Sequence, residues 1–351
     1  MPEIKNTPAF LEDDFQLRGN THDDFVDETF ASQPYWKDIS SRFRKNKGAV
    51  IGMIFILLVT LMAIIGPMIS GRTYDAQIIK HQNLAPRVPG LEKLGIMDGS
   101  EELQTSTGAK KVNKYISDKK ATGLEETYYW FGTDTLGRDL FTRTWEGTRI
   151  SLYIALVAVL VDMLFGLSYG LISGYFGGKI DAAMQRFVEI LNGIPNLVIV
   201  TLLILVLKPG LVTITFSLMI TGWIGMSRIS RAQVLKLKEQ EFVLASKTLG
   251  AKDFYIIFKE ILPNVFGQLI IMSMFSIPNA IFTEAFLAFV GLGVPQPLAS
   301  LGSLISDAFK SFTTHPYMII FPVMVLGIIM LSFNLLADGL RDAFDPKMKE
   351  M

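Results

Sequence analysis

The sequence predicts an all-helical integral membrane protein with six membrane-spanning helices and both termini in the cytoplasm. Half of its 351 residues are apolar. Six apolar runs are long enough, with some tilt, to cross the roughly 30 Å of hydrocarbon in a bilayer. Nearly all Lys and Arg of the short connections fall on the side that holds the N-terminus, which the positive-inside rule places in the cytoplasm. The runs lie near 49–70, 150–176, 190–207, 211–227, 265–290 and 316–337.

Charge and residue usage exclude several functional classes. Lys plus Arg and Asp plus Glu both number 33, so the chain as a whole has no positive excess that would attract nucleic acid. The chain has no Cys, and therefore no disulfide and no thiolate metal site. The three histidines lie far apart in the sequence and none is paired with Glu at metal-ligand spacing, so no metal site is predicted. These residues are His22, His81 and His315.

Residues 1–48 are predicted to form a cytoplasmic N-terminal region. The first 33 residues are acidic and show no apolar period, which is typical of a loosely ordered tail. From Tyr35 to Lys47, aromatic and apolar residues recur at helical spacing among basic ones. This segment is either a helix on the inner leaflet or a basic flank that only sets the topology. The run 49–70 that follows is predicted to be the first transmembrane helix and an uncleaved anchor.

The connection 71–149 is predicted to be a long extracytoplasmic loop. It is polar up to about residue 128 and aromatic from there on. Its polar part is expected to be a surface excursion. Thr133 or Asp134 is placed to cap a helix, because apolar residues follow at helical spacing. These apolar residues are Leu136, Leu140, Phe141 and Trp145.

Three glycines recur every four residues in the second span. They are Gly166, Gly170 and Gly174. Such a ridge of small residues lets the backbone of another helix approach closely. We therefore predict a helix-packing face here, with chance clustering of glycines as the alternative.

Two acidic residues lie inside predicted spans, Asp162 in the second and Glu284 in the fifth. A carboxylate at membrane depth is costly unless it faces a partner or water. On a helical wheel, Glu284 shares one half of the fifth span with Ser276, Asn279 and Thr283. We regard these five residues as candidates for lining a translocation path. The alternative for each acid is a structural hydrogen bond between helices.

The connection 228–264 contains the segment EQEFVLASKTLGAKDFYIIFKEILP, which predicts two short helices around a glycine. Gly250 stands where a helix ends in a left-handed residue. Asp253 can begin the second helix, and Pro263 is expected to end it. From the residues alone, this segment is either a helix that docks a partner or an amphipathic loop that lies on the bilayer. The first helix has a small and apolar face at i, i+3, i+4 and i+7, formed by Phe242, Ala245, Ser246 and Leu249.

The spacing of this segment resembles the coupling loop of importer-type ABC permeases, the EAA loop. The family consensus runs Glu-Ala-Ala, three residues, Gly, nine residues, Ile-x-Leu-Pro. Here Leu244 stands in place of the Glu, Ser246 in place of the second Ala and Glu260 in place of the Ile. These departures are typical of the branch that imports peptides. The matching residues are Ala245, Gly250, Leu262 and Pro263.

Four further segments resemble the oligopeptide/dipeptide permease family, most closely the C-type subunit of Gram-positive oligopeptide importers. In chain order they read GTDTLGRDLFTRTWEGTRISL, GYFGGKIDAAMQRFVEILNGIPNL, FTEAFLAFVGLGVPQP and LADGLRDAFDPK. The likeness covers roughly 36–85 and 128–349. The stretch between these two parts is an outside segment that looks longer than in most relatives.

The resemblance implies a type I ABC importer permease architecture. Residues 150–340 would form a five-helix permease core with the coupling loop 228–264, and 341–351 a cytoplasmic tail. The chain would pair with a homologous second permease, two cytoplasmic ATPases that hold ATP and Mg, and an extracytoplasmic peptide-binding protein. It would be a multi-pass protein of the plasma membrane of a Gram-positive bacterium, in contact with membrane lipid. The ATPase-coupling residues would be Phe242, Ala245, Ser246, Leu249, Gly250, Ala251 and Pro263.

The predicted function is therefore a permease subunit that moves oligopeptides across the plasma membrane, without catalytic residues or a bound cofactor. A membrane enzyme would need an acid, nucleophile or metal cluster within the spans, and the sequence shows none. The one lookalike of a phosphate loop, Gly177-Gly178-Lys179, is followed by Ile180 where Ser or Thr is required. The alternatives are another cargo, such as a nickel complex or an antimicrobial peptide, or a standalone carrier.

Overall fold

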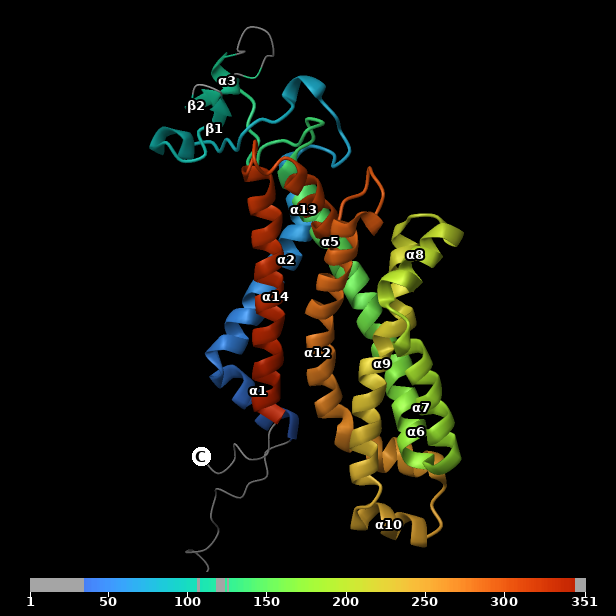
Figure 1. The fold of residues 1–351 in the computed structure, drawn as a ribbon. Helices are drawn as coiled ribbons and strands as arrows, with labels where there is room; N and C mark the ends of the chain where they lie inside the picture. The colour runs from blue at the N-terminus through green and yellow to red at the C-terminus, as the bar shows by residue number, and fades with distance from the viewer. Residues whose placement is uncertain (1–34, 106–107, 118–123, 125, 345–351) are drawn as a thin grey trace, which may run out of the picture.

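The computed structural model describes residues 35–105, 108–117, 124 and 126–344. In this part of the chain, five continuous helices are long and apolar enough to cross a membrane, and one bent pair of helices makes a sixth candidate. The all-helical membrane fold that the sequence predicts is thus confirmed (Figure 1). The predicted tail 1–33 and the end of 341–351 lie outside the described residues. The five helices are α2 (Lys47–Ser70), α5 to α6 (Leu140–Phe176), α9 (Leu211–Leu237), α11 to α12 and their extension (Asp253–Leu292), and α14 (Tyr317–Phe344).

The third predicted span, 190–207, is not one straight helix. The chain forms α7 (Gly178–Gly193) and α8 (Asn196–Leu207), and the two are bent by 78°. Ile194 is extended, with φ −91° and ψ 122°. This is the conformation that the ring of a following proline imposes, so Pro195 breaks the helix in the middle of the apolar run. The two helices together are long and apolar enough for one span, but the direction of the chain changes at the break between them.

The long second helix starts later than the predicted caps. Its N-cap is Asp139, whose carboxylate accepts a hydrogen bond from the Thr142 amide at 3.1 Å. The prediction of Thr133 or Asp134 as the cap is wrong. The reason is Gly137, which has a φ of +72° and holds the chain in a turn between Asp134 and Asp139. A Cβ at Gly137 would lie 1.9 Å from the carbonyl oxygen of Ile78, so only glycine fits this turn.

The second helix contains one wider, π-helical turn, η5 (Asp162–Gly166), between α5 (Leu140–Val161) and α6 (Leu167–Phe176). From this turn on, its glycine ridge lies against α9. A Cβ at Gly166 would meet the carbonyl oxygen of Trp223 at 2.6 Å, and one at Gly174 would meet that of Arg231 at 2.9 Å. The structure therefore places the three glycines at a close helix crossing.

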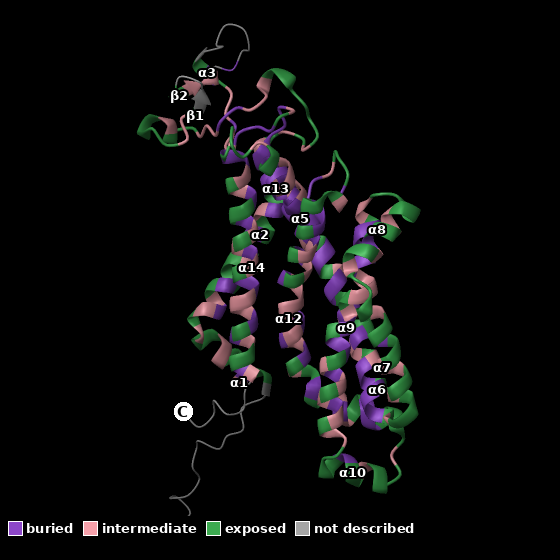
Figure 2. Ribbon diagram, viewed as in Figure 1, coloured by how far each residue is buried: buried purple, intermediate pink, exposed green. Residues whose placement is uncertain are grey.

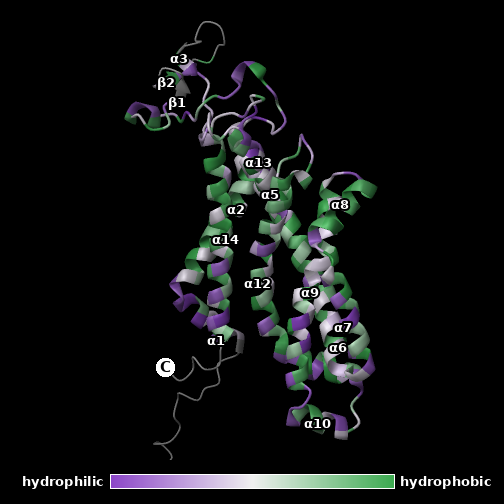
Figure 3. Ribbon diagram, in the orientation of Figure 1, coloured by the Kyte–Doolittle hydropathy of each residue, from purple (hydrophilic) through white to green (hydrophobic). Residues whose placement is uncertain are grey.

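The outer surfaces of α2 and α14 are apolar and exposed (Figures 2 and 3). This is typical of a face that meets lipid. At the end of these helices that holds Lys47 and Phe344 lies the short helix α1 (Tyr35–Lys45), beside α14. The Asn46 side chain, which also caps α2, donates a hydrogen bond to Asp342 at 2.9 Å. Exposed apolar residues of α2 include Ile51, Leu57, Leu58, Leu61 and Ile64.

The outside segment has a small core of its own. Two antiparallel strands, β1 (Ser100–Thr105) and β2 (Gly108–Asn113), lead into α3 (Lys114–Ser117). Beneath them, Leu84, Tyr115 and Tyr129 are each 1% exposed. The described part of the polar segment is thus more than the expected surface excursion, because two tyrosines and a leucine bury its centre. His315 Nδ1 lies 2.7 Å from Glu101 and ties the segment to the loop before α14. The short 3-10 turns η3 (Ile79–His81) and η4 (Leu91–Leu94) complete it.

Candidate coupling helix and translocation cavity

The predicted coupling segment forms the short helix α10 (Glu241–Thr248) at the end of the molecule opposite to the strands (Figure 1). It follows α9 directly and precedes α11 (Asp253–Tyr255), the π-helical turn η6 (Ile256–Ile261) and α12 (Leu262–Leu287). Gly250 has a φ of +82°, so α10 ends in the left-handed residue that its sequence predicts. The segment is therefore one short helix next to the start of a long one.

One side of α10 is anchored to the protein. Val243 is fully buried and packs in a cluster with Ile256, Ile257 and Ile261 of the η6 turn. The helical spacing that starts at Phe242 passes over Val243, and for this reason sequence analysis missed it. The apolar residues that follow Asp253 are the sequence signal that indicates a packing partner for Val243.

A second anchor joins α10 to the second span through Tyr175. The ammonium of Lys247 lies 4.9 Å above the centre of the Tyr175 ring. The hydroxyl of the same tyrosine donates a hydrogen bond to Asp253 at 2.7 Å. Lys238, at the end of α9, donates to the carbonyl of Gly174 at 3.1 Å. Tyr175 of α6 thus contacts both α10, through Lys247, and α11, through Asp253.

The other side of α10 is open. Leu249 is 88% exposed, and Phe242, Ala245 and Gly250 are exposed as well. Such a group of exposed apolar and small residues at the end of a polar helix is typical of an interaction site. The structure thus brings four of the predicted coupling residues to one free surface.

The remaining predicted coupling residues lie elsewhere. Ser246 is half-buried and donates a hydrogen bond to Glu260 at 3.3 Å. Ala251 is half-buried against the cluster around Val243. Pro263 is exposed in the first turn of α12. The expectation that Pro263 ends the second helix is wrong, because the helix runs on from Asp253 to Leu292 through the wider η6 turn, which accommodates a residue without an amide hydrogen.

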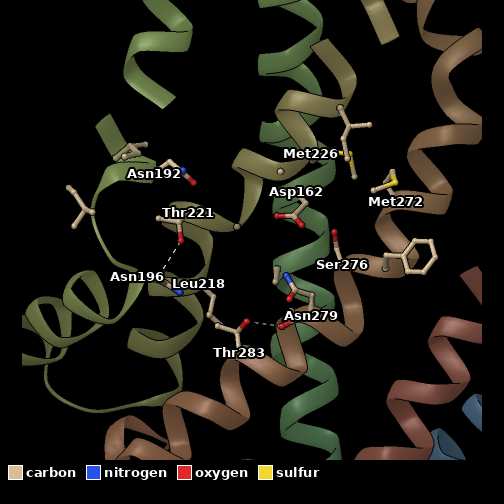
Figure 4. Close-up of a pocket in the computed structure, with 18 of the residues that line it drawn as sticks. Asp162, Asn192, Asn196, Leu218, Thr221, Met226, Met272, Ser276, Asn279 and Thr283 are labelled. Carbon is tan, nitrogen blue, oxygen red and sulfur yellow. Dashed lines mark hydrogen bonds between the residues drawn. The ribbon is translucent and has the colours of Figure 1, made fainter. Parts of the chain in front are cut away.

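A cavity of about 570 Å³ lies between the second span, the α7–α8 bend, α9 and α12. Asp162, Ser276, Asn279 and Thr283 line it together (Figure 4). Four of the five predicted path residues therefore meet at one place. Their polar neighbours come from the bend and from α9, and are Asn192, Asn196 and Thr221. The apolar part of the wall includes Leu218, Met226, Met272 and Phe275.

Asp162 begins the wider η5 turn and is 7% exposed. The Ser276 hydroxyl lies within hydrogen-bonding reach of its carboxylate. Gly222 of α9 faces the same carboxylate, and a Cβ there would lie 3.2 Å from Oδ1. The absence of a side chain at Gly222 therefore leaves room for the carboxylate beside the cavity.

Glu284 does not join this cavity. It is fully buried, and its Oε2 accepts a hydrogen bond from Ser151 of α5 at 3.1 Å. The same Ser151 oxygen accepts from the amide of Leu301, which begins α13 (Leu301–Lys310). The predicted grouping of Glu284 with the cavity residues is therefore corrected. Glu284 follows Thr283 by one residue, which turns its side chain about 100° around the helix axis, away from the cavity and toward α5 and α13.

Comparison with known proteins decides the family. Residues 166–350 match the model for the binding-protein-dependent transport system inner membrane component, and residues 34–86 match the N-terminal TM domain of oligopeptide transport permease C. The chain belongs to the family of binding-protein-dependent transport system inner membrane components. The predicted membership of the permease family is thereby confirmed, and with it the expectation of a membrane translocation subunit.

Several relatives of this permease are similar over nearly their whole length. The oligopeptide transport system permease protein OppC of Bacillus subtilis (strain 168) is 43% identical over 90% of both chains. The dipeptide transport system permease protein DppC of the same strain is 41% identical over 91% of this chain and 88% of that protein. DppC of Lactococcus lactis subsp. cremoris is 40% identical over 97% and 99%.

The permease also has some likeness to a solved structure, an inward-facing MetNI methionine ABC transporter. The sequence identity is 18% and the TM-score 0.48, over 59% of this chain and 96% of that chain. The family assignment rests on the sequence matches alone.

Proposed function

We propose that this permease forms half of the translocation path of an ATP-driven importer of oligopeptides. The observation that carries the proposal is the similarity to OppC and DppC proteins, which extends over 90% or more of this chain. The cavity supports it, because its wall mixes amides, hydroxyls and apolar side chains, which suits a cargo of varied side chains. A homologous permease would supply the other half of the path.

The open side of α10 is the proposed docking surface for a cytoplasmic ATPase. Its large exposed apolar residues, Phe242 and Leu249, would enter a groove of the partner, which is a common way of binding a short helix. The two anchors of α10 would then carry the movement of the ATPase to α6, α9 and α12. ATP and Mg would be bound by the partner, and this chain would contribute no catalytic residue.

The proposed remaining partners follow from the same family. An extracytoplasmic peptide-binding protein would deliver cargo on the side of the β1–β2 hairpin. The location would be the plasma membrane of a Gram-positive bacterium, and two of the similar proteins cited above come from Bacillus subtilis.

Crosslinking tests the coupling proposal. Leu249→Cys places a thiol on the open side of α10, and no native Cys interferes. We expect it to crosslink to an ATPase subunit carrying an engineered Cys at its groove, with a yield that changes on addition of ATP. The matched control is Leu94→Cys, which is also well exposed at 72% but lies in the outside segment, and should give no crosslink.

If Leu249→Cys forms no crosslink with any co-expressed ATPase, the coupling assignment is wrong. A standalone carrier would then be the better hypothesis. Equal crosslinking from Leu94→Cys would show that the reaction is nonspecific.

A further inference from the structure

Asp162 is the one charged residue among the described residues that line the cavity. The polar groups around it are neutral amides and hydroxyls, and no Lys, Arg or His is found in this lining. Its neighbour Ser276 can satisfy part of the carboxylate but cannot neutralise its charge. Acidic residues at membrane depth typically face a partner or a water-filled cavity, and they often mark the path of a substrate or an ion.

The position of Asp162 is built by two features of the fold. The η5 turn has π-helical geometry, which is rare in helices and is frequent at functional sites. Gly222 on the facing helix leaves the space into which the carboxylate projects. Asp162 and Ser276 lie next to one another at the cavity wall in Figure 4. The turn, the glycine and the hydroxyl thus converge on one side chain.

We infer that Asp162 binds the positively charged amino terminus of a peptide during its passage through the cavity. This inference rests on the proposed function in peptide import. Every unmodified peptide carries this ammonium group whatever its sequence, so one carboxylate can serve cargoes with different side chains. The described residues of this chain that line the cavity include no Lys, Arg or His, so the charge contact from this half of the path is to the amino end of the peptide. A single charge contact is also weak enough to be released, as a translocation path requires.

A protection experiment tests the inference without relying on the preference of a binding protein. Asn279→Cys introduces a thiol at an exposed position of the cavity wall. Its rate of reaction with an uncharged maleimide is measured in membranes that contain the assembled transporter. The probes are a tripeptide with a free amino terminus and the same tripeptide with an acetylated one. The measurement is repeated after adding Asp162→Asn, which keeps the shape of the side chain and removes its charge.

We expect the free peptide to protect the thiol at concentrations about tenfold lower than the acetylated peptide, which corresponds to about 1.4 kcal/mol of binding free energy. With Asp162→Asn, the two peptides should protect equally. Glu189→Gln is the matched control: it removes the charge of an exposed carboxylate of α7 that does not line the cavity, so the difference between the peptides should persist.

Equal protection by both peptides with Asp162 present, or a difference that survives Asp162→Asn, overturns the inference. So does a lack of protection by either peptide. Peptide uptake by the assembled transporter separates this failure from that of the proposed function. If the transporter imports peptides, only the role of Asp162 is wrong; if it imports none, the peptide cargo is wrong as well.

Discussion

Ser246 and Glu260, two residues that depart from the consensus of the coupling loop, are hydrogen-bonded to each other. The Ser246 hydroxyl donates to Glu260 Oε1 at 3.3 Å, and the bond joins α10 to the η6 turn. The consensus has Ala and Ile at these positions. The two departures therefore form one polar contact where relatives that follow the consensus would have an apolar one.

The pair should behave as a unit in a double-mutant cycle. Ser246→Ala and Glu260→Ile each remove one partner of the bond, whereas the double variant restores the consensus pair. Since both side chains are half-buried, we expect a coupling free energy of about 0.5–1 kcal/mol. Hydrogen exchange of the α10 amides in the four proteins measures it. A coupling of zero would show that the bond does not hold α10.

Gly250→Val should uncouple ATP hydrolysis from uptake while the protein still inserts into the membrane. No atom lies within 4 Å of a Cβ at Gly250, so the effect would come from its φ of +82° alone. A β-branched residue is strained in this conformation, roughly by 1–2 kcal/mol or more, and α10 would shift to relieve the strain. We expect uptake to fall by at least about tenfold, since a docking helix out of place cannot transmit movement.

Gly250→Asn is the matched control for this variant. Asparagine adopts the left-handed conformation much more readily, so most of the uptake should be retained. Uptake and ATP hydrolysis are measured in the same vesicles. Full uptake by Gly250→Val would contradict the coupling role of α10.

Gly170→Ala should destabilise the crossing of α6 and α9. The added Cβ would lie 1.7 Å from Ser230 Oγ and 2.4 Å from the carbonyl oxygen of Ser227, and the backbone atom cannot move aside cheaply. Overpacking of this kind typically costs about 1–3 kcal/mol. Gly327→Ala in α14 adds the same methyl group where nothing lies within 4 Å. Thermal unfolding in detergent should separate the two, with a lower melting temperature for Gly170→Ala only.

Glu284→Ala should lower stability and leave cargo preference unchanged. It removes the acceptor of the Ser151 hydroxyl in a fully buried place, for which we expect a loss of about 1–3 kcal/mol. Glu284→Gln keeps an acceptor there and should be milder. Relative uptake across a panel of peptides is the second measurement. A change of preference in Glu284→Gln would return this residue to the translocation path.

The outside segment should loosen in acid because of His81. Its Nδ1 lies 2.7 Å from the Tyr129 hydroxyl. Burial, and then the charge of Arg72, lower the pKa of His81 from its ordinary value of 6.5. The unfolded segment therefore binds a proton more readily than the folded one. Stability contributed by neutral His81 is complete above pH 6.5, is lost as the pH falls below it, and stops changing below the folded pKa.

Hydrogen exchange of the amides around Ile79–His81, corrected for its intrinsic pH dependence, measures this effect. Protection should be lower at about pH 5 than at about pH 8, with the decrease below about pH 6.5. His81→Asn keeps a hydrogen-bonding side chain that does not titrate, so its protection should not change with pH in this way. The same loss in both proteins would assign the acid sensitivity to another group.

Much of the fold could be predicted from local properties of the chain. The apolar runs follow from composition and length, because a spanning helix must satisfy its own backbone and match the bilayer. Two further features depend only on residues close together in the sequence. They are the left-handed end of α10 at Gly250 and the ridge of small residues in the second span. Family membership followed from short motifs whose spacing is retained.

The contacts between helices were decided only by the tertiary structure. A helical wheel orders the residues around one helix but does not say which neighbour packs on each side. It therefore grouped Glu284 with Asn279, although one is buried against α5 and α13 and the other lines the cavity. Helical spacing also missed the burial of Val243, because its packing partners in the η6 turn follow Gly250 in the chain. Composition and spacing thus determined the helices, their order and the family, whereas the facing of each polar side chain depended on long-range packing that no local pattern encodes.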